Sequence, residues 1–396
     1  MTTLRSVLAL SFVLPLSVGL GCGGDDTPPV DAGPLGMARA DTVRALGEEV
    51  VVEGYRNFVE EARRLRDLTQ AWATSGAEVD REAAAASWDR AMGLWQQAEL
   101  TLVGPAGAMG TTPGGEDRRD AIYSWPIVNR CRIDQELVEQ AYADVDAFAA
   151  EAVNVRGLDT LEYLLFQTGD DNGCAPNASI NLDGTWAPIV AELPARRAAY
   201  ASTAATLVVR DAEALLARWD EGFLAELQSA GAGSSVYPTA QEALNALSDA
   251  LFYLDKEAKD MKLADPMGLS MTCTATVCPE LRESRYAGRS IPNVADNLRG
   301  FRLVFAGANG GTGRGFDDLL ASVGAEALAA QAITLIDEAI AIADAIEGDV
   351  PELLAADANA LQPLYDAIKA ITDLLKTQIL GTLDLELPDR AEGDND

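Results

Sequence analysis

The sequence of 396 residues contains no histidine, and only five of its residues are lysine. The absence of histidine excludes Ser-His-Asp and Cys-His triads, and it excludes zinc and haem sites that need a histidine ligand. Basic residues are scarce, because 30 Lys and Arg face 62 Asp and Glu and give a formal net charge of -32. A surface of that sign repels phosphate backbones, so we expect no nucleic-acid partner.

Long apolar runs are also missing, except near the N-terminus. Arg5 is the only charge in the first 24 residues, and an apolar run from Val7 to Leu20 has the length of a signal-peptide core. The run ends in Gly-Leu-Gly before Cys22, which resembles a bacterial lipoprotein signal. We therefore predict a signal peptide over residues 1–21 and lipidation of Cys22, with an ordinary secretory signal as the alternative.

The segment after Cys22 is rich in Gly, Pro and Asp, and we predict a flexible tether over residues 22–40. We therefore expect the folded part of the protein to be held at the membrane by the lipid on Cys22. Gly23 and Gly24 follow Cys22, where many lipoproteins retained at the inner membrane have Asp. We expect an outer-membrane lipoprotein of the cell envelope, facing the periplasm or the cell surface.

Four cysteines remain after Cys22, an even number that suits an oxidising compartment. Cys273 and Cys278 are close in sequence, so their disulfide is the simplest pairing, which leaves Cys131 with Cys174. A zinc site built from all four cysteines is the alternative, although the paired C-x2-C spacing of such sites is missing.

The rest of the chain favours helices, since Ala, Leu, Glu, Asp and Arg dominate and apolar residues recur with a period of 3.6. We predict an all-α fold of two packed antiparallel helical-bundle domains. The N-terminal half spans 41–185 and the C-terminal half 186–396. The predicted helices cover residues 41–74, 80–103, 133–150, 155–167, 186–229, 238–262, 293–306, 315–347 and 351–380.

One short segment concentrates the candidate chemistry. Asp159 and Glu162 are three residues apart, so on a helix they project from the same face. Two carboxylates this close repel each other unless a proton or a cation lies between them, and they can ligate a hard metal ion. From the residues alone, two solvated acids with Arg156 paired to Asp159 remain the simpler interpretation.

The same segment resembles the GxHxxE signature of the imelysin family, with Gly157 at the glycine, Asp159 at the histidine and Glu162 at the glutamate. Four other segments are similar to that family in the same order, so that the resemblance extends from about residue 43 to 380. They are Trp88 to Glu99 with Gly104-Pro105, Trp125-Pro126-Ile127 with Arg132-Ile133-Asp134, 259–263 with Pro266-Met267-Gly268, and 283–286 with Ser290 and 297–300.

The resemblance implies an exported two-bundle protein that is linked to bacterial iron uptake, with the motif at the interface between the domains. Because Asp159 replaces the histidine, a metal site here would be all-oxygen and would suit Fe, Mn or Ca. We expect Glu99 and Glu283 to join Asp159 and Glu162 as candidate ligands. Iron-uptake or other envelope proteins are candidate partners.

Three functions remain open from the sequence. The first is an envelope lipoprotein that binds a metal ion, an iron complex or a partner protein at these carboxylates. The second is an imelysin-type metallopeptidase, which the missing histidine disfavours. The third is a structural lipoprotein whose ancestral site has decayed.

Overall fold

The computed structural model describes residues 31 and 33–391, so the predicted signal peptide and Cys22 lie outside the described residues. All regular structure in the described part is helical, which confirms the all-α prediction. No helix within these residues combines the length and apolar character needed to cross a membrane.

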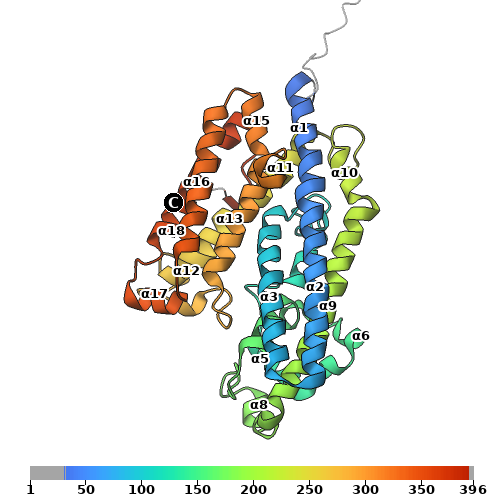
Figure 1. The fold of residues 1–396 in the computed structure, drawn as a ribbon, viewed down its shortest axis with the longest axis vertical. Helices are drawn as coiled ribbons and strands as arrows, with labels where there is room; N and C mark the ends of the chain where they lie inside the picture. Colours follow the sequence, from blue (N-terminus) through green and yellow to red (C-terminus); the bar gives the residue numbers. More distant parts are fainter. Residues whose placement is uncertain (1–30, 32, 392–396) are drawn as a thin grey trace, which may run out of the picture.

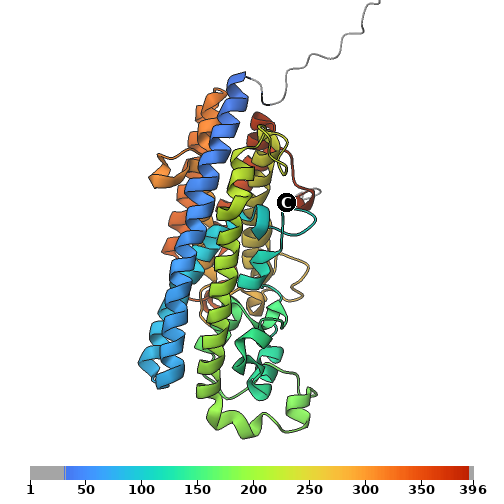
Figure 2. The same cartoon turned by 90° about the vertical axis from the view of Figure 1, so that its right-hand side faces the viewer.

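Two groups of helices lie side by side (Figure 1). In the first, α2 (Glu53–Ser75), α3 (Glu78–Ala98) and α9 (Leu193–Arg218) pack lengthwise. In the second, α16 (Glu326–Ala345) packs between α13 (Ser290–Ala306) and α18 (Gln362–Leu374). The long α9 follows α2, so helices from both sides of position 185 share the first group (Figure 2).

The shorter helices complete these groups and form their connections. The α-helical ones are α1 (Gly33–Ala45), α4 (Arg118–Ile122), α5 (Arg130–Glu139), α6 (Val145–Phe148), α7 (Leu158–Phe166), α8 (Ser179–Leu182), α10 (Leu224–Gln228), α11 (Ala240–Leu251), α12 (Asp265–Met267), α14 (Ala308–Gly311), α15 (Phe316–Ser322), α17 (Val350–Ala356) and α19 (Leu380–Leu383).

Several helices continue through π-helical turns or are joined by 3₁₀ turns. The π-helical segments are η1 (Leu46–Val52), η7 (Trp219–Phe223), η8 (Leu254–Ala264) and η10 (Leu375–Ile379). The 3₁₀ segments are η2 (Glu99–Thr101), η3 (Gly104–Ala106), η4 (Ala141–Ala143), η5 (Val153–Val155), η6 (Ala187–Glu192), η9 (Pro279–Leu281) and η11 (Asp389–Ala391).

The first helix begins earlier than the sequence suggests, and the tether predicted over residues 22–40 is wrong from Gly33 onward. Arg39 is buried and donates a hydrogen bond to the carbonyl oxygen of Leu383 (3.2 Å). The Asp31 carboxylate accepts one from the backbone N–H of Ala240 (2.8 Å). These contacts hold the start of α1 against distant parts of the chain, and a Gly- and Pro-rich composition does not reveal them.

The two groups meet where α13 crosses α3. At this crossing a Cβ on Gly300 would lie 2.4 Å from the carbonyl oxygen of Gln97. Glycine therefore permits the close approach of the two backbones. The crossing also brings Gln96 of α3 next to Asn297 of α13, whose side-chain nitrogen donates to the side-chain oxygen of Gln96 (2.9 Å).

Both disulfides have the pairing expected from the sequence, Cys131–Cys174 and Cys273–Cys278. The first ties the start of α5 to the loop before α8. The second closes a loop of the segment between α12 and η9. The four-cysteine zinc site is therefore absent from the structure.

Candidate functional site

The motif helix α7 is buried in the interior of the first group. Every residue from Leu158 to Leu165 is buried. Gly157 precedes it with a φ of 97°, and a Cβ there would lie 2.8 Å from the carbonyl oxygen of Ile122. The Trp88 indole N–H donates to the carbonyl oxygen of Leu158 (2.7 Å). A side chain at position 157 would be strained by the positive φ and would clash with the Ile122 carbonyl oxygen, so glycine is required to start this helix.

Asp159 is buried and has no ion-pair partner among the described residues. It is 4% exposed, and its carboxylate accepts hydrogen bonds from the Ser124 hydroxyl (2.5 Å) and from the Thr160 backbone N–H (2.9 Å). Burial raises the pKa of Asp159 to about 6, although these hydrogen bonds oppose the rise. The simpler interpretation, a solvated acid paired with Arg156, is wrong, since Arg156 pairs with Asp211 (3.4 Å).

Glu162 is buried beside it, 6% exposed, and within the described residues it has no ion-pair partner either. Its Oε1 accepts the backbone N–H groups of Tyr286 (2.7 Å) and Ala287 (3.0 Å) from the loop before α13. Burial raises the pKa of Glu162 to about 7, and the negative charges of Glu283 and Asp159 add to the rise. Near neutral pH the carboxyl is therefore partly protonated.

Glu283 comes from a distant segment, as expected, and is fully buried. Its Oε1 accepts from the Tyr123 hydroxyl (2.5 Å) and the Gln96 amide (3.1 Å), and it lies 3.1 Å from the Lys262 ammonium. Its Oε2 is buried and accepts no hydrogen bond from the described residues. Glu283 lies three residues before Tyr286, whose backbone N–H donates to Glu162, so this segment approaches the motif helix.

Lys262 is the buried cation of this cluster. It was not among the candidate site residues predicted from the sequence. It lies on η8 and donates to the side-chain oxygens of Gln96 (2.6 Å) and Asn297 (2.8 Å). Its ammonium also lies over the Tyr253 ring at 5.2 Å. Burial lowers the pKa of Lys262, and the Glu283 charge opposes that effect. Lys262 lies in segment 259–263, which resembles the family, and this resemblance was the sequence feature that could have identified it as a site residue.

Glu99, the fourth expected acid, is fully buried at the end of α3 but is held in an ion pair. The Arg119 guanidinium contacts it through Nε (3.1 Å) and Nη2 (3.1 Å). The Trp95 indole N–H donates to it as well (2.5 Å). Glu99 is thus neutralised by Arg119, whereas Asp159 and Glu162 are not neutralised by any cation of the described chain.

These residues do not enclose a metal ion as a complete set of protein ligands. Within the described residues, no group of three or more His, Cys, Asp or Glu side chains is arranged to hold one. Both Asp159 oxygens and Glu162 Oε1 are already occupied by hydrogen bonds. The oxygens that accept no hydrogen bond from the described chain are Glu162 Oε2 and Glu283 Oε2. The cluster therefore fits a cation that brings most of its own ligands and does not fit a closed protein-ligated metal centre.

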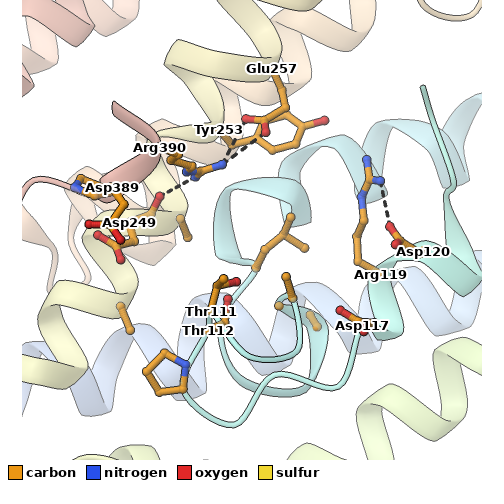
Figure 3. Close-up of a pocket in the computed structure, with 18 of the residues that line it drawn as sticks. Thr111, Thr112, Asp117, Arg119, Asp120, Asp249, Tyr253, Glu257, Asp389 and Arg390 are labelled. Atoms are coloured by element: carbon orange, nitrogen blue, oxygen red, sulfur yellow. Dashed lines mark hydrogen bonds and ion pairs between the residues drawn. The ribbon is translucent and has the colours of Figure 1, made fainter. Parts of the chain in front are cut away.

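A cavity of about 610 Å³ lies next to this network (Figure 3). One side is formed by the segment 102–126, which contains η3 and α4, and the other by the segments that carry α11, η8 and η11. Arg119 lines it and also pairs with Asp120 (3.2 Å). On the opposite wall Arg390 pairs with Glu257 (3.2 Å) and donates to the Asp249 carbonyl oxygen (2.7 Å). Arg119 therefore connects the cavity wall to Glu99, while the motif carboxylates are not among the lining residues.

Comparisons with known proteins place the chain in a family. The Imelysin family model matches residues 51–378. No curated protein matches the sequence. Among solved structures, an imelysin-like protein from Psychrobacter arcticum 273-4 has 18% identity and a TM-score of 0.66, over 88% of this chain and 96% of that one.

A second solved structure is described as that of an iron-regulated protein A precursor from Parabacteroides distasonis ATCC 8503. It has 16% identity and a TM-score of 0.69, over 89% of this chain and 96% of that one. At these identities the two structures establish a shared fold. Because the family model spans most of the sequence, the chain belongs to the imelysin family.

Proposed function

We propose that this chain is a non-catalytic binding protein of the bacterial cell envelope, anchored through Cys22, that takes iron as a hydrated ion or a complex beside Asp159 and Glu162. The observation that carries the proposal is that both carboxylates are buried without an ion-pair partner in the described chain. Buried acids in that state are neutralised by protons or by a bound cation.

The electrostatics support exchange between protons and a cation. The pKa values of about 6 and 7 place partial protonation of the two acids close to neutral pH. A cation that enters beside them displaces protons, because metal binding needs the carboxylate form. Glu162 Oε2 and Glu283 Oε2 are the protein oxygens left for it, and water or a chelator supplies the remaining ligands.

One consideration disfavours zinc, and a second favours iron among the remaining cations. An all-oxygen donor set suits iron and manganese better than zinc. A solved structure with the same fold is described as an iron-regulated protein A precursor. A peptidase that relies on a histidine-ligated zinc water is disfavoured, because the sequence contains no histidine.

The proposal is tested by anaerobic calorimetric titration of Fe(II), Mn(II), Ca(II) and Zn(II) into the mature protein. Glu162→Gln keeps the size of the side chain and removes its charge, and Glu347→Gln alters an exposed acid as the control. We expect iron to bind the wild type, at least about tenfold weaker iron binding to Glu162→Gln, and no change in the control. Absent binding, or equal binding in all three proteins, would overturn the proposal and favour a decayed site.

A further inference from the structure

A second cavity, of about 540 Å³, opens at the start of α5. Three segments line it, namely residues 127–131, positions between 163 and 173, and the pair Arg285 and Tyr286. Its volume is typical of small-molecule sites. The only acidic side chain in the lining is Asp171, which is exposed.

Two arginines in this cavity lack a charge partner. Arg130 and Arg285 are half-buried. Neither guanidinium group forms an ion pair or a hydrogen bond with the described residues, whereas the Arg285 backbone carbonyl accepts one from Arg282 (3.0 Å). Both guanidinium groups lie over the ring of Tyr286, at 5.3 and 5.4 Å from its centroid.

This situation is exceptional in the molecule. Every other buried or half-buried arginine of the described chain contacts a carboxylate or a carbonyl oxygen. Acids are also abundant, since the formal net charge is -32. Two partly buried cations without an ion pair are therefore unusual in so acidic a protein.

The two guanidinium groups also act on each other. Burial lowers the pKa of Arg130, Tyr286 and Glu162 oppose this effect, and the positive charge of Arg285 adds to it. An anion between them would relieve this repulsion. Guanidinium groups bind carboxylates and phosphates through paired N–H···O bonds. The N-terminus of the ten-residue helix α5 lies at the same cavity and adds to the positive potential.

We propose that this cavity binds a small molecule bearing an oxyanion, a carboxylate or a phosphate, with Arg130 and Arg285 as its charge partners. The cavity borders the motif carboxylates, because the Tyr286 backbone N–H donates to Glu162. The proposal needs no metal and does not depend on iron binding at Asp159 and Glu162.

The test is calorimetric titration of citrate, inorganic phosphate and glycerol into the mature protein, in buffer stripped of metal on a chelating resin. The variants are Arg130→Gln and Arg285→Gln, and the control is Arg64→Gln, which alters an exposed arginine without a partner among the described residues. We expect citrate or phosphate to bind the wild type and glycerol not to bind. Each cavity variant should bind at least about tenfold more weakly, and the control should be unchanged.

The relative affinities of citrate and phosphate distinguish the two kinds of oxyanion. Circular dichroism checks that each variant is folded, and Arg285→Gln, which alters a loop residue, serves if a change in α5 prevents folding. Glu162→Gln should retain oxyanion binding, which separates this proposal from the iron site. Binding of neither anion, or equal affinity in the wild type and both cavity variants, would overturn the proposal.

Discussion

At the scale of single residues, Lys262 holds the buried polar network together. It is fully buried, pairs with Glu283 and donates to Gln96 and Asn297. Replacing one partner of a buried ion pair leaves the other charge uncompensated. We predict that Lys262→Met lowers the free energy of unfolding by about 3–5 kcal/mol, measured by urea denaturation.

The matched control is Arg44→Met, which removes an exposed ion pair with Asp41. Exposed pairs contribute less than about 1 kcal/mol, so the control should stay close to the wild type. A Lys262→Met protein as stable as the control would show that the network does not need its cation.

Asp159 and Glu162 also make the stability of the protein depend on pH. Asp159 and Glu162 have folded-state pKa values near 6 and 7, raised above the ordinary values of 3.8 and 4.5. Between those limits the folded state binds more protons than the unfolded state, so the stability from these groups is present at low pH and is lost as pH rises. We predict that Glu162→Gln is more stable than the wild type at pH 8, by on the order of 2–3 kcal/mol. The advantage should shrink toward pH 4.5.

Urea denaturation of the wild type and Glu162→Gln at a series of pH values measures this difference directly. The pH dependence of groups that do not interact with Glu162 cancels when the two curves are subtracted, so the difference reports Glu162 and its electrostatic coupling to Asp159 and Glu283. A difference that does not change with pH would mean that Glu162 has its ordinary pKa in the folded protein.

All four buried acids of the cluster were predicted as candidate ligands from the sequence. The sequence could not show which cations neutralise them. Glu99 and Glu283 are paired with Arg119 and Lys262, which come from other segments. Such partners are set by tertiary packing and leave no local pattern. The spacing of Asp159 and Glu162 described a shared helix face, but it did not reveal that this face is buried.

At the scale of secondary-structure elements, the crossing of α3 and α13 positions the network. Gly300 allows the two backbones to approach, because a Cβ there would meet the Gln97 carbonyl oxygen at 2.4 Å. We predict that Gly300→Ala lowers the free energy of unfolding by about 1–3 kcal/mol through overpacking. The control, Gly54→Ala in α2, meets nothing within 4 Å and should stabilise by about 0.5–1 kcal/mol. Equal effects at the two positions would contradict the close crossing.

Helix positions were largely predictable from the sequence, whereas their interruptions were not. The helix predicted over 133–150 divides at Gln140, whose φ of 57° ends α5. Asp144 caps the N-terminus of α6, and its carboxylate accepts the backbone N–H groups of Asp146 and Ala147. Periodicity extends across such breaks, because the apolar positions on either side still face the same core.

At the scale of the whole molecule, the proposed function includes a lipid anchor at Cys22, which lies outside the described residues. The apolar run before Cys22 and the Gly-rich segment after it predict lipidation and export. We predict that Cys22→Ser moves the protein from the membrane fraction to the soluble fraction, measured by immunoblotting of separated fractions. If the variant stays with membranes to the same extent as the wild type, the lipid anchor is wrong.

The net charge of -32 suits a protein that collects cations. Asp134 of α5 is also buried without an ion pair in the described residues, and burial raises its pKa to about 6. The motif helix differs in carrying two such acids, Asp159 and Glu162, next to each other. In the proposed function the overall charge raises the local cation concentration, and Asp159 and Glu162 supply the site.

The most direct test of the central claim, that Asp159 and Glu162 exchange protons for iron, is the number of protons released on binding. Anaerobic calorimetry of Fe(II) at pH 6.5, in buffers of different ionisation enthalpy, measures that number. Because the two pKa values lie near 6 and 7, we predict release of about one proton from the wild type and much less from the Asp159→Asn, Glu162→Gln double variant. Iron binding without proton release, or the same release from both proteins, would contradict the account.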